Sequence, residues 1–173
     1  VDVAELSRRH RVDVSHPTRV ADVPVMLRRI GELTGTEAAA EGWARAVEER
    51  LATASRQPRV SFAYLVWKGP FMAAAGGTYI SDLVETFGGR NVFPAGSGPW
   101  PKTGEEELRA LSPELLVLPD EPYRFGEDDR AFWSGALRGT RVVRVPGDDF
   151  CWHGVRTLKG LEAARALLAE GVR

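Results

Sequence analysis

The most constraining feature of this sequence is a repeated order of apolar strand, loop and helix that begins after Pro58. The stretch RVSFAYLVW, residues 59–67, is apolar almost without a break, which is typical of a strand buried on both faces of a parallel sheet. Further strand patterns follow at residues 91–93, 114–120 and 141–146. Helical patterns come after the four strands, at residues 78–89, 104–112, 127–139 and 154–171. Because parallel strands need crossover connections, this order predicts an α/β fold with a parallel, doubly wound sheet of about four strands.

The first third of the chain has helical periodicity instead. In residues 18–35 apolar residues recur at steps of three and four, and Gly35 ends the pattern. Pro24 fits a helix that begins near Asp22, where proline falls in the first turn. Residues 36–56 predict a second helix, longer than the ~11 to 12 residues of an average helix. Its apolar stripe is narrow and its other faces are charged, which favours a helix that lies along a surface or bridges two lobes.

Composition and charge exclude several classes of function. With 173 residues, 43% of them hydrophobic, the chain can form one ordinary domain with an appendage. A formal net charge of −1 argues against a nucleic-acid partner and against a polybasic membrane patch. Cys151 is the single cysteine, so neither an intrachain disulfide nor a cysteine-pair zinc site can form. His10, His16 and His153 have no metal-ligand spacing, so no metal site held by the protein itself is expected.

No apolar run approaches the ~20 residues of a membrane span, and the first residues contain no signal-peptide hydrophobic region. Either the chain is intracellular or its export signal lies upstream.

Aromatic residues gather in the loops that follow the strands. In an open parallel sheet the ligand crevice lies beyond the carboxyl ends of the strands. The four loops there, at residues 67–78, 95–103, 119–127 and 146–156, hold seven of the fifteen aromatic residues: Trp67, Phe71, Trp100, Tyr123, Phe125, Phe150 and Trp152. Loops are ordinarily polar, so this excess indicates a flat apolar ligand or a protein interface. The alternative is that several rings only cover the ends of the sheet.

A polar cluster follows the last strand. Asp148, Asp149, His153 and Arg156 lie within nine residues. Three interpretations remain open: an acid–base group for catalysis, a polar rim that recognises a ligand, or a structural cap in which the arginine pairs with an aspartate.

Several stretches taken together resemble a known family. The patterns GGRNVF, WPKTGEE, LSPELLVLP and RTLKGL occur in this order within residues 59–168. In combination they resemble the carboxyl-terminal lobe of ABC-transporter substrate-binding proteins of the cobalamin and ferric-siderophore class, the helical-backbone metal receptors. The resemblance implies two α/β lobes joined by one long helix, with the ligand between them. It implies a remnant of the amino-terminal lobe at residues 1–35, the linker helix at 36–58 and the carboxyl-terminal lobe at 59–173, with most of the amino-terminal lobe absent.

The function implied by the resemblance is binding, not catalysis. A protein of this kind captures a metal chelate such as cobalamin, a ferric siderophore or haem and delivers it to the permease of an ABC importer. It has no cofactor of its own, since the metal arrives inside the ligand. It lies in the periplasm or on the extracellular face of the cell envelope, and it meets the membrane only through the permease or a lipid anchor upstream.

The resemblance also assigns individual residues. Trp100 falls on the family's cleft tryptophan, and the flanking prolines stiffen it so that little conformational entropy is lost on binding. Phe71 matches a cleft aromatic, and Asp148 or Asp149 matches a ligand-contacting aspartate. Trp152 stands where some cobalamin binders carry arginine. The full expected ligand-binding set is Trp67, Phe71, Trp100, Tyr123, Asp148, Asp149, Trp152 and Arg156.

A separate site is expected for the permease. Glu106 lies six residues after Trp100, where the family has an exposed glutamate that pairs with permease arginines, and Glu105 is the alternative. A negatively charged first helical turn is the structural explanation for the same residues.

Two rival functions remain. One is a protein-interaction module that uses the aromatic edge. The other is a doubly wound enzyme that uses Asp149 and His153.

Overall fold

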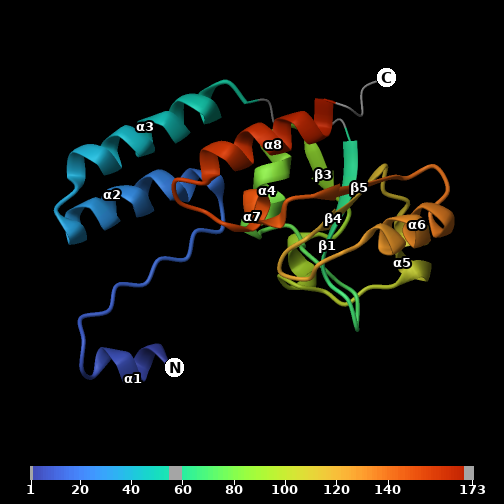
Figure 1. Ribbon diagram of the computed structural model, residues 1–173, viewed down its shortest axis with the longest axis horizontal. Helices are drawn as coiled ribbons and strands as arrows, with labels where there is room; N and C mark the ends of the chain where they lie inside the picture. Colours follow the sequence, from blue (N-terminus) through green and yellow to red (C-terminus); the bar gives the residue numbers. More distant parts are fainter. Residues whose placement is uncertain (1, 55–59, 170–173) are drawn as a thin grey trace.

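The computed structural model describes residues 2–54 and 60–169 and contains a mainly parallel sheet with helices on both faces (Figure 1). The sheet order is β2-β1-β4-β5, and β3 pairs with β1. Strands β3, β1, β4 and β5 are parallel, whereas β2 runs antiparallel to β1. Their bounds are β1 Val60–Trp67, β2 Met72–Ala73, β3 Gly89–Asn91, β4 Leu115–Pro119 and β5 Arg141–Val145. The predicted α/β fold with about four parallel strands is confirmed.

Two details of the sheet differ from the prediction. Strand β3 begins at Gly89 and ends at Asn91, two residues earlier than the predicted strand at 91–93. It forms because Gly89 pairs with Val60 in parallel register, a contact that leaves no apolar pattern in the sequence. Strand β2 was not predicted, since a two-residue strand carries no periodicity.

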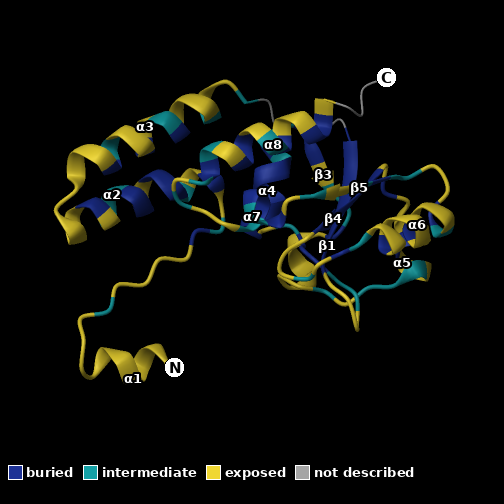
Figure 2. Ribbon diagram, in the orientation of Figure 1, coloured by how far each residue is buried: buried dark blue, intermediate teal, exposed yellow. Residues whose placement is uncertain are grey.

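The two faces of β1 belong to two separate cores. Because side chains alternate along a strand, Phe62 and Tyr64 face one core and Ala63 and Leu65 face the other. All four are fully buried, as the continuous apolar pattern predicts. One face is covered by α4 Tyr79–Glu85, α7 Gly147–Cys151 and α8 Thr157–Ala169, and the other by α5 Glu105–Leu111 and α6 Glu127–Ala136 (Figures 1 and 2). Helix α7 lies inside the segment 146–156, which was predicted to be a loop.

Helices α2 (Val23–Thr34) and α3 (Glu37–Ala52) form an antiparallel hairpin around Gly35, whose φ of 69° suits glycine. Pro24 lies in the first turn of α2, as predicted. Helix α3 ends at Ala52, so it is shorter than the predicted helix at 36–56, and residues 55–59 lie outside the described residues.

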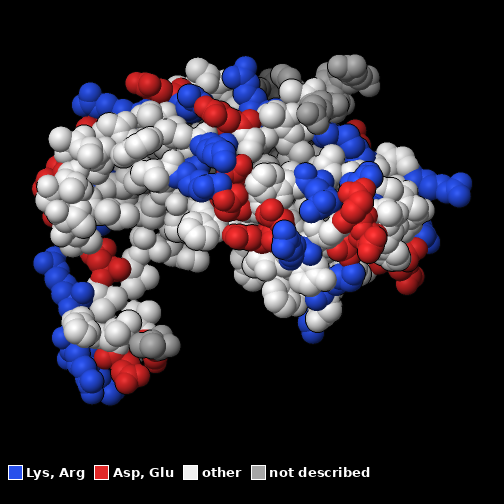
Figure 3. Space-filling model, viewed as in Figure 1, with Lys and Arg blue, Asp and Glu red and all other residues white. Residues whose placement is uncertain are grey.

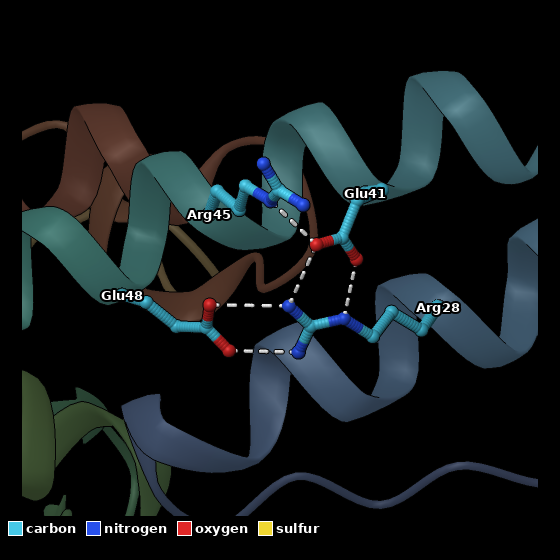
Figure 4. A network of polar contacts seen from close by, with 4 residues as sticks. All are labelled: Arg28, Glu41, Arg45 and Glu48. Carbon is cyan, nitrogen blue, oxygen red and sulfur yellow. Dashed lines mark hydrogen bonds and ion pairs between the residues drawn. The ribbon is translucent and has the colours of Figure 1, made fainter.

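Ion pairs connect the two helices of this hairpin. The guanidinium of Arg28 on α2 contacts Glu41 at 2.6 Å and Glu48 at 2.7 Å, both on α3 (Figure 4). Glu41 also accepts a hydrogen bond of 2.7 Å from Arg45, and these two arginines lower the pKa of Glu41 to about 2. At its other end α3 is joined to α8 by an ion pair of 2.6 Å between Arg50 and Glu162. The long helix therefore lies along α2 and α8 on the surface.

The amino-terminal segment extends away from this body. Helix α1 (Val3–Ser7) has no buried residue, and residues 11–18 have no regular secondary structure (Figures 1 and 2). The chain rejoins the core at a 3₁₀ turn, Val20–Asp22, where the buried amide of Val20 donates a hydrogen bond of 2.7 Å to Asp82. Pro17 is buried just before this turn.

Charges are mixed over the surface, in keeping with a net charge of −1. In Figure 3, acidic and basic side chains are interspersed over the helices of the viewed face. Among the described residues, no helix is both long and apolar enough to cross a membrane.

Candidate functional site

A cavity of about 540 Å³ lies at the edge of the sheet where the parallel strands end. Each of the four loops in which the aromatic residues gather contributes to its lining. The contributions are Gly77 and Thr78, Pro99 and Trp100, Glu121 and Pro122, and Cys151, Trp152 and His153. The end of β1, the first turn of α4 and the amino-terminal segment complete it with Val66, Tyr79, Ile80, His16, Pro17 and Thr18. Its volume is within the range of ordinary ligand pockets.

Trp100 is held at this cavity by a backbone ladder. The amide of Ala75 donates to the carbonyl of Pro99 at 3.1 Å, and the amide of Ala73 donates to the carbonyl of Pro101 at 3.0 Å. The two prolines cannot donate backbone hydrogen bonds, but both accept one from the segment that contains β2. The indole between them is 45% exposed. A rigid loop thus presents a large, half-exposed ring to the cavity.

Trp152 is the second exposed ring of the cavity, and the loop after β4 supports it. Its Nε1 donates a hydrogen bond of 3.2 Å to Oε2 of Glu121. The two loops meet closely: the amide of Gly147 donates to Asp120 at 2.6 Å, and a Cβ added at Gly147 would lie 2.4 Å from the carbonyl oxygen of Glu121. Glycine is needed here because any side chain would collide with that backbone.

Burial disfavours the charged forms of three titratable side chains that line the cavity. Burial raises the pKa of Tyr79 to about 12, and its hydroxyl lies 2.8 Å from that of Thr157. Burial also raises the pKa of the Cys151 thiol to about 11. Burial, followed by the charge of His16, lowers the pKa of His153, whose ring meets Tyr79 edge to face with centroids 5.7 Å apart. The neutral thiol is a poor nucleophile, so the cavity is equipped for recognition more than for nucleophilic chemistry.

Several rings that were expected to bind ligand form a separate cluster. Trp67 contacts Tyr123 at 5.7 Å between centroids, Tyr123 contacts Phe125 at 4.8 Å, and Phe71 contacts Trp133 at 5.0 Å. Phe71, Tyr123, Phe125 and Trp133 belong to the core between the sheet and α5 and α6. In the part of the chain that the structure describes, the cavity lining includes Trp100 and Trp152 but none of the other five loop aromatics. For Trp67, Phe71 and Tyr123, ligand binding stays a prediction.

The polar cluster after β5 is paired internally. Arg156 forms an ion pair with Asp148 and a second one, of 3.0 Å, with Asp149. Lys159 lies 3.5 Å from Asp149, which is 5% exposed. These contacts match the structural interpretation of the cluster. Among the described residues, the cavity lining includes His153 but not Asp148, Asp149, Arg156 or Lys159. No hydrogen bond or ion pair in that part of the chain joins Asp149 to His153.

The two candidate docking glutamates differ in their surroundings. Glu105, the first residue of α5, forms an ion pair with Arg109 one turn later. Glu106 is exposed, and within residues 2–54 and 60–169 its carboxylate has no hydrogen-bond or ion-pair partner. This difference favours Glu106 over Glu105 as the residue available to a partner protein.

The sequence did not reveal His16, Pro17, Thr18, Tyr79 or Ile80 as parts of the cavity. His16, Pro17 and Thr18 line the cavity because the amino-terminal segment passes beside it, and no local sequence pattern predicts the course of that segment. Tyr79 and Ile80 belong to the first turn of α4 and follow Gly76 and Gly77. The glycine pair before a helix was the available signal for that turn.

Within the described residues, no group of three histidine, cysteine, aspartate or glutamate side chains could hold a metal ion.

Similar sequences include named binding proteins. No protein-family model matches the chain. The vitamin B12-binding protein of Photorhabdus laumondii is 26% identical over 159 residues, which are 88% of this chain and 56% of that protein. The vitamin B12-binding protein of Vibrio campbellii is 33% identical over 84 residues, 47% of this chain and 30% of that protein. The chain therefore spans about half the length, or less, of the curated relatives it matches.

Solved structures share the fold. The periplasmic vitamin B12-binding protein BtuF of Vibrio cholerae superposes with a TM-score of 0.80 at 18% identity, over 98% of this chain and 69% of that one. The periplasmic haem-binding protein HutB of Vibrio cholerae gives a TM-score of 0.75 at 16% identity, over 96% of this chain and 71% of that one. The resemblance noted in the sequence is confirmed: this chain has the fold of part of such periplasmic binding proteins.

Proposed function

We propose that this chain is the carboxyl-terminal lobe and linker of a solute-binding protein that captures a metal chelate for an ABC importer. The observation that carries this proposal is the cavity at the carboxyl ends of the parallel strands, lined by the half-exposed rings of Trp100 and Trp152. Aromatic faces bind flat or bulky apolar ligands with little loss of side-chain entropy. The fold and the names of the similar proteins support the same function.

The proposed ligand is cobalamin, haem or a ferric siderophore. The relatives and structural neighbours are named for vitamin B12, haem and Fe³⁺-hydroxamate. The cavity holds part of such a ligand, and a second lobe would cover the rest. The metal comes with the ligand, and the protein needs no cofactor of its own. Residues 1–35, 36–58 and 59–173 would then be the end of the first lobe, the linker and the second lobe.

The receptor binds and releases its ligand without bond chemistry. The thiol of Cys151 stays protonated at neutral pH, and Asp149 is engaged by Arg156 and Lys159. Neither residue is poised for acid–base or nucleophilic work.

The permease would meet the free carboxylate of Glu106 at the start of α5. A charge on the rim of an interface guides docking and orientation more than it adds affinity. Such a receptor works in the periplasm or on the outer face of the cell envelope, where the chelate is collected.

Native mass spectrometry tests this function. The 173-residue chain, alone and joined to an amino-terminal lobe, would be mixed with cyanocobalamin, hemin and ferrichrome. A complex at a 1:1 ratio, strengthened by the second lobe, is the expected result. If no chelate binds to either form and a dimer appears instead, the proposal fails and the aromatic edge is a protein interface.

A further inference from the structure

Strand β5 is an edge strand, and its outer side is open. It pairs with β4 alone, in parallel register. The backbone amide of Arg141 and the backbone carbonyl of Val145 bond to the segment of β4. Backbone groups alternate in direction along a strand, so the N–H and C=O groups of Val142 and Arg144 point outward. In the part of the chain that the structure describes, these four groups have no hydrogen-bond partner.

A cavity of about 440 Å³ lies along this open side and is called here the β5 groove. Its lining consists of Arg130, Val142, Val143, Arg144, Val145, Pro146, Phe150, Ala163, Ala166 and Leu167. These residues come from α6, β5, α7 and α8, and α6 and α8 lie on opposite faces of the sheet (Figure 1). The groove therefore has one helix on each side of the strand edge. Among the described residues, it shares no lining residue with the cavity at the strand ends.

The wall of the β5 groove on the side of α8 is apolar. Val143 and Val145 point to this side and are only half-buried, although they pack against the core. Helix α8 places the small side chains of Ala163 and Ala166 above them. Small side chains on the helix leave room for the side chains of an added strand.

The wall on the side of α6 is basic. Arg130 and Arg144 line it, and the described lining includes no acidic residue. Glu127 forms an ion pair with Arg130 and lies 3.9 Å from a guanidinium nitrogen of Arg144. Two guanidinium groups thus share this one carboxylate, and both are partly exposed. A second carboxylate that entered the groove could accept hydrogen bonds from either of them.

We propose that the β5 groove binds an extended peptide segment of another protein, in which apolar and acidic residues alternate. The segment adds a strand antiparallel to β5 and exchanges backbone hydrogen bonds with Val142 and Arg144. Its acidic residues lie opposite these two and face Arg130, and its apolar residues face α8. A single strand fits between α6 and α8, whereas the sheet of a second copy would bring its own helices against them. This site does not depend on the proposed capture of a chelate.

Fluorescence anisotropy with labelled hexapeptides tests the proposal. The probe alternates valine and glutamate and has blocked ends. A peptide with lysine in place of glutamate should bind about tenfold more weakly, because its charges oppose those of the groove. N-methylation of the glutamate amides should have an effect of similar size, since these N–H groups are the ones that face β5. N-methylation of the valine amides is the matched control and should leave the affinity unchanged, since those groups face solvent.

Hydrogen exchange followed by NMR locates the bound strand. Saturating valine–glutamate peptide should slow exchange of the Val142 and Arg144 amides about tenfold or more. The amides of Val143 and Val145 already face β4, so their exchange should change little. Such an alternating pattern is expected from strand addition and not from contact with side chains alone.

Three variants test the two walls. Ala166→Phe fills the groove from an exposed position of α8 and should abolish peptide binding, whereas Ala39→Phe, at an exposed position of α3, should not. Arg130→Gln should weaken binding of the glutamate peptide about fivefold and leave that of a valine–glutamine peptide unchanged. All three variants should retain the melting temperature and the chelate affinity of the wild type.

Several results would overturn the proposal. Absence of binding by the valine–glutamate peptide, or unchanged exchange at Val142 and Arg144 in its presence, would disprove strand addition. Equal affinities for the glutamate and lysine peptides would disprove an acidic partner. Laurate has an apolar chain and a carboxylate but no amide; if laurate binds more tightly than the peptide, the groove is a site for an amphiphilic anion. Chelate binding is measured separately, so failure here leaves the proposed function intact.

Discussion

Nε1 of Trp152 donates a hydrogen bond of 3.2 Å to Oε2 of Glu121, and this bond joins the loop after β5 to the loop after β4. Trp152 is 60% exposed, so few packing contacts fix its ring. The carboxylate holds the indole in place before a ligand arrives, and such preorganisation strengthens binding.

Removing this carboxylate should weaken ligand binding. Glu121→Ala is expected to reduce chelate affinity about fivefold, since one hydrogen bond contributes about 1 kcal/mol. Glu121→Gln keeps an acceptor for the indole and should retain most of the affinity. Isothermal titration calorimetry measures both. Equal losses in the two variants would show that the charge, and not the hydrogen bond, matters.

Trp100 should contribute to binding and little to stability. Trp100→Ala is expected to weaken chelate binding about tenfold, or 1.4 kcal/mol, because an aromatic contact is lost. Trp43→Ala on α3 is the matched control, since both rings are 45% exposed and Trp43 lies away from the cavity. The two variants should melt at similar temperatures by circular dichroism. Unchanged affinity in Trp100→Ala would argue strongly against the proposed cleft.

Glu106 should affect transport without affecting ligand binding. Glu106→Ala is expected to leave chelate affinity unchanged and to reduce uptake of labelled chelate by cells, since the permease contact is lost. Glu107→Ala removes a neighbouring exposed carboxylate and serves as the control. Normal uptake with Glu106→Ala would remove the docking assignment.

Gly147 should be required for stability. Gly147→Ala forces a Cβ against the backbone of Glu121, and we expect it to lower the free energy of unfolding by about 1–3 kcal/mol. In contrast, Gly42→Ala lies in α3 with open space around the added carbon and should raise it by about 1 kcal/mol. Urea denaturation gives both values, and a neutral Gly147→Ala would show that the two loops can separate freely.

The ion pair at the start of α6 should give stability that depends on pH. Burial alone would raise the pKa of Asp129, but hydrogen bonds from Lys68 at 2.5 Å and from the amide of Gly126 at 2.8 Å outweigh it and lower the pKa below 3.8. As the pH falls, Asp129 is therefore protonated in the unfolded chain before it is protonated in the folded protein. The stability that the Asp129 carboxylate contributes is present above pH 3.8 and is lost as the pH falls through the pKa of Asp129 in the folded protein.

Asp129→Asn should accordingly be less stable than the wild type at pH 7, by about 1 kcal/mol, and the difference should shrink in acid. Thermal melts between pH 2 and pH 7 measure it. Asp128→Asn, at an exposed neighbour, is the control. A difference that stays constant with pH would mean that the amide group itself disturbs the helix start.

The parallel strands could be predicted because their signal is local. β1 and β4 each carry an apolar run that the sheet buries, and β5 carries three valines of which Val142 is buried. β2 could not be predicted, since it exists through pairing with β1 and with the distant loop around Trp100. The start of β3 at Gly89 was missed for a related reason: Gly89 packs against Val84 and Phe62, where only a hydrogen atom fits.

The candidate site could be predicted as a place but not as a set of residues. Topology alone indicated which loops would meet, and each of them lines the cavity. The sequence alone could not show which aromatic rings line the cavity and which belong to the core. Phe150 lies in the same loop as Trp152, and Phe125 lies in another of the four loops, yet both phenylalanines are buried, because the direction of a loop side chain depends on tertiary contacts. His16 had no local signal for the same reason.

The five tryptophans differ in burial, and this provides two optical signals from one unlabelled protein. Trp133 is fully buried, so its fluorescence should emit at the blue edge and report unfolding. The other four tryptophans are 43–60% exposed and should emit further to the red, and two of these four, Trp100 and Trp152, face the cavity. A coloured chelate that enters the cavity would quench the red emission first, so that binding and unfolding can be followed at different wavelengths in the same sample.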